Sequence, residues 1–232
     1  MKTLILTGAG ISAESGVPTF RASDGLWEGH RVEDVATPDA FFRNPALVHE
    51  FYNMRRAHLH EVEPNPAHRA LAALEKKLGE SLTLVTQNVD DLHERGGSQR
   101  VIHMHGSLLR AWCLKCDERF LWRGAMNTAS KCPFCRETGD VRPDIVWFGE
   151  MPYQMDVIEK ALVDCEVFVS IGTSGAVNPA AGFVQIAKHC GAHTIEINPQ
   201  PTQNAAHFDE QIMGNAGSEV PRWVAQMIAE LS

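Results

Sequence analysis

The sequence has no long apolar run and no excess of positive charge. No stretch approaches the roughly 18 consecutive apolar residues that a membrane-spanning helix requires. Lysine and arginine number 21 against 29 aspartates and glutamates, and the resulting formal net charge of −8 repels a phosphate backbone. The apolar run from Leu4 to Leu6 is too short for the core of a signal peptide. We therefore expect a cytoplasmic monomer that binds neither nucleic acid nor membranes.

Cysteine is also sparse, and four of the six cysteines form two C-x-x-C pairs separated by 15 residues. In a reducing cytoplasm this spacing favours a zinc ribbon, with disulfides or redox thiols as the alternatives. Four thiolates close the tetrahedron and leave no position for water, so the zinc is expected to be structural. The predicted ligands are Cys113, Cys116, Cys132 and Cys135.

Short apolar runs at 3–6, 82–85, 167–171 and 194–197 are typical of buried parallel strands. Helical patterns lie between them, which predicts an α/β fold with a doubly wound parallel (Rossmann-like) sheet. The predicted helices cover residues 45–59, 67–78, 157–163 and 180–189.

Two segments interrupt the alternation of strands and helices. Residues 31–77 have helical character, and residues 108–141 carry the cysteines. We interpret both as insertions, one helical and one a zinc ribbon. The Rossmann-like domain then consists of residues 1–30, 78–107 and 142–232.

Glycines follow the first predicted strand. Residues 8–13 fit G-x-G-x-x-(G/A), a pattern in which glycines let a pyrophosphate approach the backbone. A simple tight turn is the alternative. Pro18 soon breaks the helix, and no second strand with a terminal acid follows about 20 residues later. This departure favours NAD chemistry other than hydride transfer by a dehydrogenase.

Polar side chains at the other strand ends are candidates for the same site, because ligands bind beyond the carboxyl ends of parallel strands. Gln87, Asn88 and Asp90 can recognise a carboxamide or hold a water, or can simply cap a turn. His103 and His105 stand two residues apart, and an imidazole there can take a proton from a ribose hydroxyl. His105, next to a glycine, is the better candidate; a hydrogen-bonded structural role is the alternative for each.

Two further groups suggest a substrate site. Arg55 lies on the apolar stripe of the helix from Pro45, three residues after Tyr52, and its guanidinium suits a carboxylate. Alternatively, Arg55 reaches solvent over an apolar surface. Residues 146–150 read as an extended segment that either pairs with a bound peptide or forms a core strand.

The whole set of motifs resembles the sirtuins, the NAD-dependent protein deacylases, and the resemblance covers nearly the entire chain. Its elements occur in the order GAGISAESGVPTFR, TQNVDDLHERGG, HMHGS, the two cysteine pairs, RPDIVWFGE, GTS and EINP. The resemblance is to a bacterial sirtuin with little beyond the catalytic core. It implies that NAD is consumed as a co-substrate and that one zinc ion is structural.

The resemblance also implies residue roles. His105 matches the general base. The implied NAD-binding residues are Gly8, Ala9, Gly10, Ile11, Ser12, Ala13, Glu14, Phe20, Arg21, Trp27, Gln87, Asn88, Val89, Asp90, Gly172, Thr173, Ser174, Asn198, Pro199, Gln200 and Ala216. The implied substrate-binding residues are Ala36, Tyr52, Arg55, Val146, Trp147, Phe148, Gly149 and Glu150.

Ala36, Tyr52 and Arg55 resemble the sirtuins that remove succinyl and malonyl groups, so both acetyl-lysine and negatively charged acyl-lysines of proteins are expected substrates. The implied reaction joins the acyl oxygen to the ribose carbon as nicotinamide leaves. His105 then deprotonates a ribose hydroxyl, which attacks the acyl carbon, and water completes the release of free lysine and O-acyl-ADP-ribose. The alternatives are transfer of ADP-ribose to a protein, an NAD oxidoreductase and a non-catalytic zinc-stabilised binding module.

Overall fold

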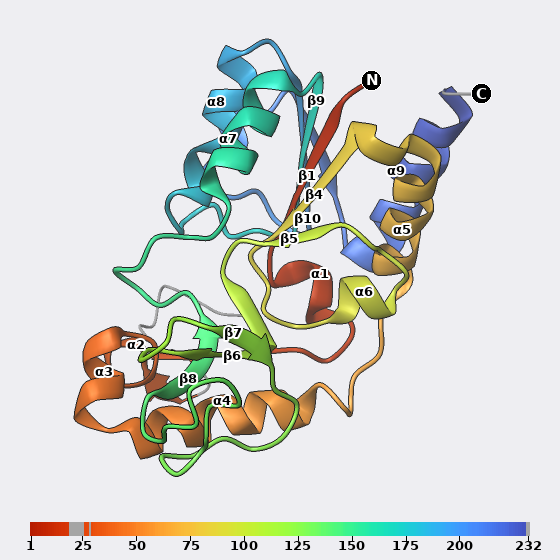
Figure 1. The fold of residues 1–232 in the computed structure, drawn as a ribbon. Coiled ribbons are helices and arrows are strands. Elements are labelled where there is room, and N and C mark those ends of the chain that lie inside the picture. Colours follow the sequence, from red (N-terminus) through yellow and green to blue (C-terminus); the bar gives the residue numbers. More distant parts are fainter. Residues whose placement is uncertain (19–25, 28, 231–232) are drawn as a thin grey trace.

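The computed structural model describes residues 1–18, 26–27 and 29–230. Its centre is a parallel sheet of six strands with helices on both faces (Figure 1). The strands in spatial order are β11 (Glu210–Met213), β10 (His193–Asn198), β9 (Val167–Ile171), β1 (Thr3–Thr7), β4 (Leu82–Thr86) and β5 (Val101–His103).

The four predicted strands form the middle of this sheet, which confirms the predicted α/β class. The two outer strands, β5 and β11, were not predicted. β11 is polar and mostly exposed, and β5 has three half-buried residues, so neither shows a buried apolar run. Within the sheet, Thr7 pairs in register with Thr86 on one side and with Ile171 on the other. The carboxyl ends of the central strands therefore meet at one edge.

Alternating residues of each strand enter different cores. Ile5 packs towards α5 (Pro66–Leu78) and α9 (Ala216–Glu230), whereas Leu4 and Leu6 pack towards α7 (Met155–Asp164) and α8 (Phe183–His189). Figure 1 shows the two helix pairs on opposite faces of the sheet. The six-stranded sheet and its helices form the larger layer of the protein. Short helical segments complete it: α1 (Gly10–Ala13), α6 (Leu92–Arg95), η2 (Gly79–Ser81), η3 (Ala180–Gly182) and η4 (Ala205–His207).

A smaller layer lies beyond the carboxyl edge of the sheet (Figure 1). It combines an antiparallel sheet of three strands with helices from the first third of the chain. Its elements are β6 (Gly106–Cys113), β7 (Arg119–Leu121), β8 (Val141–Ile145), α2 (Val32–Val35), α3 (Pro38–Arg43), α4 (Pro45–His58) and the two-stranded ribbon β2 (Leu26–Trp27) and β3 (His30–Arg31). The predicted start of α4 is confirmed, because the Asn44 side chain accepts a hydrogen bond from the Leu47 amide.

The packing of α5 departs from the predicted helical insertion at 31–77. Ala67, Leu71 and Leu74 of α5 are buried in the core of the six-stranded sheet, next to Val220 and Val224 of α9. A helical pattern reveals an apolar face but not the core that it enters. We therefore propose that the helical insertion ends before Pro66 and that α5 belongs to the larger layer. None of the helices among the described residues has the length and apolar character needed to cross a membrane.

Candidate active site

A cavity of about 1060 Å³ is lined by residues from both layers, including the carboxyl edge of the large sheet. The sequence motifs predicted most of the residues that line it. The predicted residues in its lining are Gly8, Ala9, Gly10, Ala36, Tyr52, Arg55, Gln87, Asn88, Val89, Asp90, His105, Val146, Trp147, Phe148, Gly149, Glu150, Gly172, Thr173 and Ser174.

The other predicted NAD-binding residues are either outside this lining or not described by the structure. Ile11, Ser12, Ala13, Glu14, Asn198, Pro199, Gln200 and Ala216 do not line this cavity. Asn198 is nevertheless next to it, because its amide donates to the Thr173 carbonyl at 2.9 Å. Phe20 and Arg21, together with the side chain of Trp27, lie outside the described residues.

The glycines of the first motif pack directly against the end of β9. The Gly10 amide donates to the Gly172 carbonyl at 2.8 Å, and the Gly8 amide donates to that of Ile171 at 3.0 Å. A Cβ on Gly10 would lie 2.6 Å from the Gly172 Cα, closer than real Cβ contacts allow. Glycine is therefore required here for contact between two strand ends, besides any approach by a phosphate.

A buried hydrogen-bonded chain joins α1 to the end of β4. The Ser12 hydroxyl donates to Asp90 Oδ2 at 3.1 Å and accepts from Asn88 Nδ2 at 3.1 Å. The Leu92 amide donates to Asp90 Oδ1 at 3.1 Å. Burial raises the pKa of Asp90 despite these hydrogen bonds, which oppose the rise. The chain fixes the orientations of the Asn88 amide and the Asp90 carboxylate at the cavity.

His68 on α5 extends this chain, and the sequence analysis missed it. Its Nδ1 accepts from the Asn65 amide at 3.3 Å, so in the neutral ring Nε2 carries the proton. That Nε2 lies 3.4 Å from the Ser12 hydroxyl oxygen. Burial lowers the pKa of His68 to about 4, which keeps the ring neutral. Its 56-residue separation from Ser12 left no local sequence signal.

The two histidines of the HMHGS motif have opposite environments. His105 Nδ1 lies 3.2 Å from the Gln87 carbonyl oxygen, which only accepts, so Nδ1 carries the proton and Nε2 has a free lone pair. Burial lowers the pKa of His105. His103 instead lies between the Asn88 carbonyl, at 3.2 Å, and a Glu94 carboxylate oxygen, at 2.6 Å. Burial lowers the pKa of His103, but Glu94 outweighs that effect and raises it. His105 is thus the ring able to accept a proton.

Side chains from α4 and the end of α2 form another part of the cavity wall. Arg55 is buried, with Cζ 5.6 Å from the centroid of the Phe51 ring. Tyr52 is fully buried and accepts a hydrogen bond from Trp147 Nε1 at 2.9 Å. Burial raises the pKa of Tyr52 to about 12, so its phenol stays protonated. Ala36 is 2% exposed and contributes only a methyl group to the wall.

The segment 146–150 does not form the core strand that was the alternative to a peptide-pairing segment. β8 ends at Ile145, and the chain then turns through Gly149, whose φ is 91°. The Phe148 amide donates to the Ala36 carbonyl at 3.0 Å. Glu150 accepts from Arg142 through both oxygens, at 2.6 and 2.9 Å, so its carboxylate is already engaged within the protein.

The cavity also includes residues that the motifs did not indicate. His58 and Leu59 follow Arg55 at helical spacing, and this spacing could have identified them. Val17 and Pro18 belong to the first motif and Ile145 to RPDIVWFGE, but none of the three was assigned a role, and the rest lie outside the motifs. The additional lining residues are Val17, Pro18, Val32, Glu33, Thr37, Met54, His58, Leu59, Leu108, Ile145, Pro152, Ala176, Val177 and Asn178.

The four predicted cysteine ligands meet in the smaller layer. Their sulfur atoms all lie within 4.8 Å of one another. The Cys113–Cys135 and Cys116–Cys132 sulfur pairs are 3.7 and 3.6 Å apart, too far for disulfides. A tetrahedral zinc with bonds of about 2.3 Å separates its sulfur ligands by about 3.8 Å. The cluster therefore fits a structural zinc ion and leaves no ligand position open.

Comparison with known proteins settles the family. The sequence profile described as the Sir2 family matches residues 8–179. The chain belongs to the Sir2 family. This sirtuin is 55% identical over 230 residues to the NAD-dependent protein deacylase of Pasteurella multocida (strain Pm70), covering 98% of both chains.

Solved Sir2 structures share the fold. A Sir2 homologue in complex with NAD superposes on this sirtuin with a TM-score of 0.89 at 42% identity, covering all of this chain and 91% of the other. A mutant Sir2 homologue in complex with 2'-O-acetyl-ADP-ribose gives a TM-score of 0.89 at 40% identity, covering all of this chain and 93% of that one. The sirtuin resemblance and the Rossmann-like fold with a four-cysteine insert are confirmed.

Proposed function

We propose that the large cavity is the active site in which this sirtuin, an NAD-dependent protein deacylase, removes acetyl and dicarboxylic acyl groups from protein lysines. NAD is the co-substrate. One observation carries the proposal: His105 lines the same cavity as the glycine-bearing strand ends and as Tyr52 and Arg55. A proton acceptor, a dinucleotide site and an acyl site are thus combined in one space.

NAD would lie along the carboxyl edge of the sheet. Gly8 and Gly10 have no side chains there, so a ligand can approach their backbone. Residues 172–174 form the adjoining wall of the cavity. Asn88 and Asp90, held by Ser12, would recognise the nicotinamide carboxamide. Residues 198–200, which follow β10, would reach the adenosine ribose, and Ala216 the adenine. Phe20, Arg21 and Trp27 stay predictions for the nicotinamide end.

His105 would act as the general base. Its unprotonated Nε2 can accept a proton from a ribose hydroxyl, while the Gln87 carbonyl fixes the tautomer through Nδ1. The lowered pKa of His105 keeps this lone pair available at neutral pH. Bound NAD would supply the glycosidic bond between ribose and nicotinamide. Cleavage of this bond releases nicotinamide, and the ribose carbon bonds to the acyl oxygen. The four-cysteine cluster would stabilise the smaller layer and take no part in these steps.

The acyl group would enter the wall formed by Ala36, Tyr52 and Arg55. The small Ala36 side chain leaves space, and Tyr52 keeps a phenol proton because burial raises its pKa. Arg55 can donate to a terminal carboxylate, as in succinyl-lysine and malonyl-lysine. The backbone of 146–150 would contact the substrate peptide next to this wall. An acetyl group fills the same space without using the guanidinium.

The decisive experiment incubates the protein with NAD and matched acetyl, malonyl, succinyl and longer acyl peptides. Mass spectrometry should show the peptide losing its acyl group while nicotinamide and O-acyl-ADP-ribose appear together. ADP-ribose appearing on a protein, with the peptide untouched, would instead support ADP-ribosyl transfer. Growth of reduced nicotinamide absorbance would support an oxidoreductase. The His105→Ala variant is the matched inactive control.

The cellular compartment of the reaction and the oligomeric state of the enzyme are also proposals. We propose that acylated cytoplasmic proteins are the substrates, supported by four close cysteine sulfurs at distances that suit metal rather than disulfides. The expected monomeric state stays a prediction, which light scattering after gel filtration would test.

A further inference from the structure

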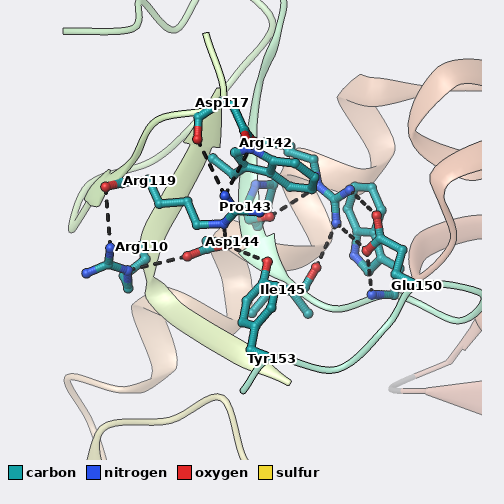
Figure 2. A network of polar contacts seen from close by, with 11 residues as sticks. Arg110, Asp117, Arg119, Arg142, Pro143, Asp144, Ile145, Glu150 and Tyr153 are labelled. Atoms are coloured by element: carbon teal, nitrogen blue, oxygen red, sulfur yellow. Dashed lines mark hydrogen bonds and ion pairs between the residues drawn. The ribbon is translucent and has the colours of Figure 1, made fainter. Parts of the chain in front are cut away.

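Arg142 on β8 is a buried cation whose side chain bonds to the turn that follows β8. Its side chain is 2% exposed, and its guanidinium forms a bidentate pair with Glu150, at 2.6 and 2.9 Å. The same guanidinium donates to the Ile145 carbonyl at 2.7 Å. Figure 2 shows Arg142 between these two partners. One side chain therefore holds both the start of the 146–150 segment and its last residue.

The opposite partner, Glu150, holds the middle of the segment. Glu150 Oε2 accepts from the Trp147 amide at 2.8 Å while it also accepts from Arg142. The Arg142 Cζ lies 3.3 Å from the centroid of a Trp147 ring, so the guanidinium stacks on this indole. Trp147 is fixed through its main chain and its ring together, and it lines the cavity.

The stack continues into the cysteine-bearing insert. Arg142 lies 5.0 Å from the centroid of Trp112, and the Arg119 guanidinium lies 4.2 Å from that residue's aromatic system. Arg119 is also 5.4 Å from the Tyr153 ring. Tyr153, Arg119, Trp112, Arg142 and Trp147 therefore alternate aromatic ring and cation, and we name this series the cation–aromatic stack.

Asp144 closes one side of the stack. Its carboxylate, 2% exposed as a residue, accepts from Tyr153 at 2.8 Å and pairs with Arg110 and Arg119, each at 3.3 Å (Figure 2). The positive charges of the stack are thus compensated by Asp144, which pairs with the partly exposed Arg119, and by Glu150, which pairs with the buried Arg142. Compensation of this kind makes the arrangement rigid, because a buried charge without its partner is costly.

We propose that Arg142 and Glu150 are positioning residues for substrate binding, which hold Trp147 and the 146–150 turn in the shape that receives the acylated peptide. This inference rests on the proposed function, since it assumes that the turn contacts the peptide. The cation–aromatic stack ties that shape to Trp112, the residue immediately before Cys113. The cysteine insert would thus influence peptide binding without contributing a group to the chemistry.

A purely structural role makes a different prediction. If the pair only stabilised the smaller layer, its loss would lower the melting temperature and leave the kinetic constants of the remaining folded enzyme unchanged. A positioning role changes the KM for the peptide and spares the KM for NAD, because the predicted NAD-binding residues that the structure describes, except Trp27, come from the larger layer. The two roles are therefore separable by kinetics.

The test uses the full-length, zinc-containing protein with an acetylated peptide. Glu150→Gln keeps the shape of the side chain and removes its charge. We expect it to raise the KM for the peptide about tenfold or more, since small misplacements near a reacting group carry large penalties. The KM for NAD should stay within about twofold of wild type. Arg142→Lys, which keeps the charge but cannot form the bidentate pair, should weaken peptide binding less than Arg142→Met.

Arg110→Met is the matched control, because among the described residues the Arg110 guanidinium bonds to Asp144 and to the Arg119 carbonyl, and not to Glu150 or Trp147. It should leave the peptide KM unchanged. Zinc content and melting temperature identify variants that fail to fold; if Arg142→Met is one, Glu150→Gln decides alone. An unchanged peptide KM in Glu150→Gln, or equal rises for peptide and NAD, would overturn the positioning role. If wild type itself releases no nicotinamide with acylated peptides, the proposed function fails instead.

Discussion

The Ser12 hydroxyl donates to the Asp90 carboxylate at 3.1 Å, across a separation of 78 residues. This bond joins the helix after β1 to the polar segment after β4. Asn88 donates to the same hydroxyl, so one serine orients both an amide and a carboxylate at the cavity. Asp90 is buried in this arrangement. Burial raises its pKa, because the charged carboxylate is less stable there than in water.

Replacing Asp90 by asparagine should therefore stabilise the protein and impair NAD use. Since the folded-state pKa lies above the unfolded value, stability of the wild type falls as pH rises from the unfolded pKa through the folded pKa. Asp90→Asn removes this loss. We expect the Tm of Asp90→Asn relative to that of the wild type to increase from pH 4 to pH 7, because the variant lacks the titrating carboxyl. Thermal unfolding against pH measures this increase, and the KM for NAD should rise; an unaltered KM would contradict the carboxamide role.

His105→Ala should lower kcat by about a hundredfold to ten-thousandfold, the usual contribution of a general base. In the wild type, the neutral ring is the active form. Burial lowers the pKa of His105, so the acidic limb of the rate profile should lie below the ordinary histidine value of about 6.5. Formation of the deacylated peptide, measured from pH 5 to 9, tests this. Activity retained by the alanine variant would refute the assignment, and His103→Asn provides a comparison at the neighbouring imidazole.

Arg55→Met should weaken desuccinylation far more than deacetylation. Loss of a charge-assisted hydrogen bond to the acyl carboxylate costs roughly 1.5 to 3 kcal/mol, or about tenfold to 150-fold in kcat/KM. Matched acetyl and succinyl peptides of the same sequence provide the internal control. Equal losses on the two peptides would mean that Arg55 supports the fold of α4 rather than binding a carboxylate.

Removal of zinc should unfold the smaller sheet before the larger one, because metal binding at a four-thiolate site is folding free energy. Hydrogen exchange after chelation should show β6, β7 and β8 losing protection while β1, β4 and β9 keep it. Elemental analysis confirms that the metal has been removed. A fully protected and active zinc-free protein would be contrary evidence.

Gly10→Ala should destabilise the fold by about 1 to 3 kcal/mol, the usual cost of overpacking. Its new methyl group would lie 2.6 Å from the Gly172 Cα and push two strand ends apart, so the KM for NAD should rise as well. Gly124→Ala is the matched control, since a Cβ there meets nothing within 4 Å. Similar unfolding curves for the two variants would contradict the contact.

Much of the fold followed from the sequence because β1, β4, β9 and β10 are buried on both faces and therefore read as continuous apolar runs. The zinc ligands followed from spacing, since each pair is local. β11 escaped prediction because its side chains are mostly exposed. The helix predicted at 67–78 is present as α5 (Pro66–Leu78), but its partner helix lies about 150 residues further along, and no local pattern reveals such a contact.

The candidate site likewise contains residues that local sequence predicts and contacts that it does not. Residues at strand ends were predictable, because parallel strands bring their carboxyl ends to one edge. His68 was not, because its partner Ser12 belongs to another segment. Glu150 was expected to touch substrate, yet its carboxylate pairs with Arg142. A sequence motif identifies which residues matter and leaves open which of them contact each other.

Asn53 on α4 forms two reciprocal hydrogen bonds with the main chain of Met126, at 2.7 and 2.8 Å. The same helix packs Val48 and Phe51 into a core shared with Leu108, the first residue of the cysteine insert, and with Ile145, which follows the insert. Excising residues 108–141 would therefore remove Leu108 from this core and leave Asn53 Nδ2 without the Met126 carbonyl, while Asn53 Oδ1 would keep its hydrogen bond from Arg56. Truncation at this point should destabilise the smaller layer and, with it, one wall of the cavity.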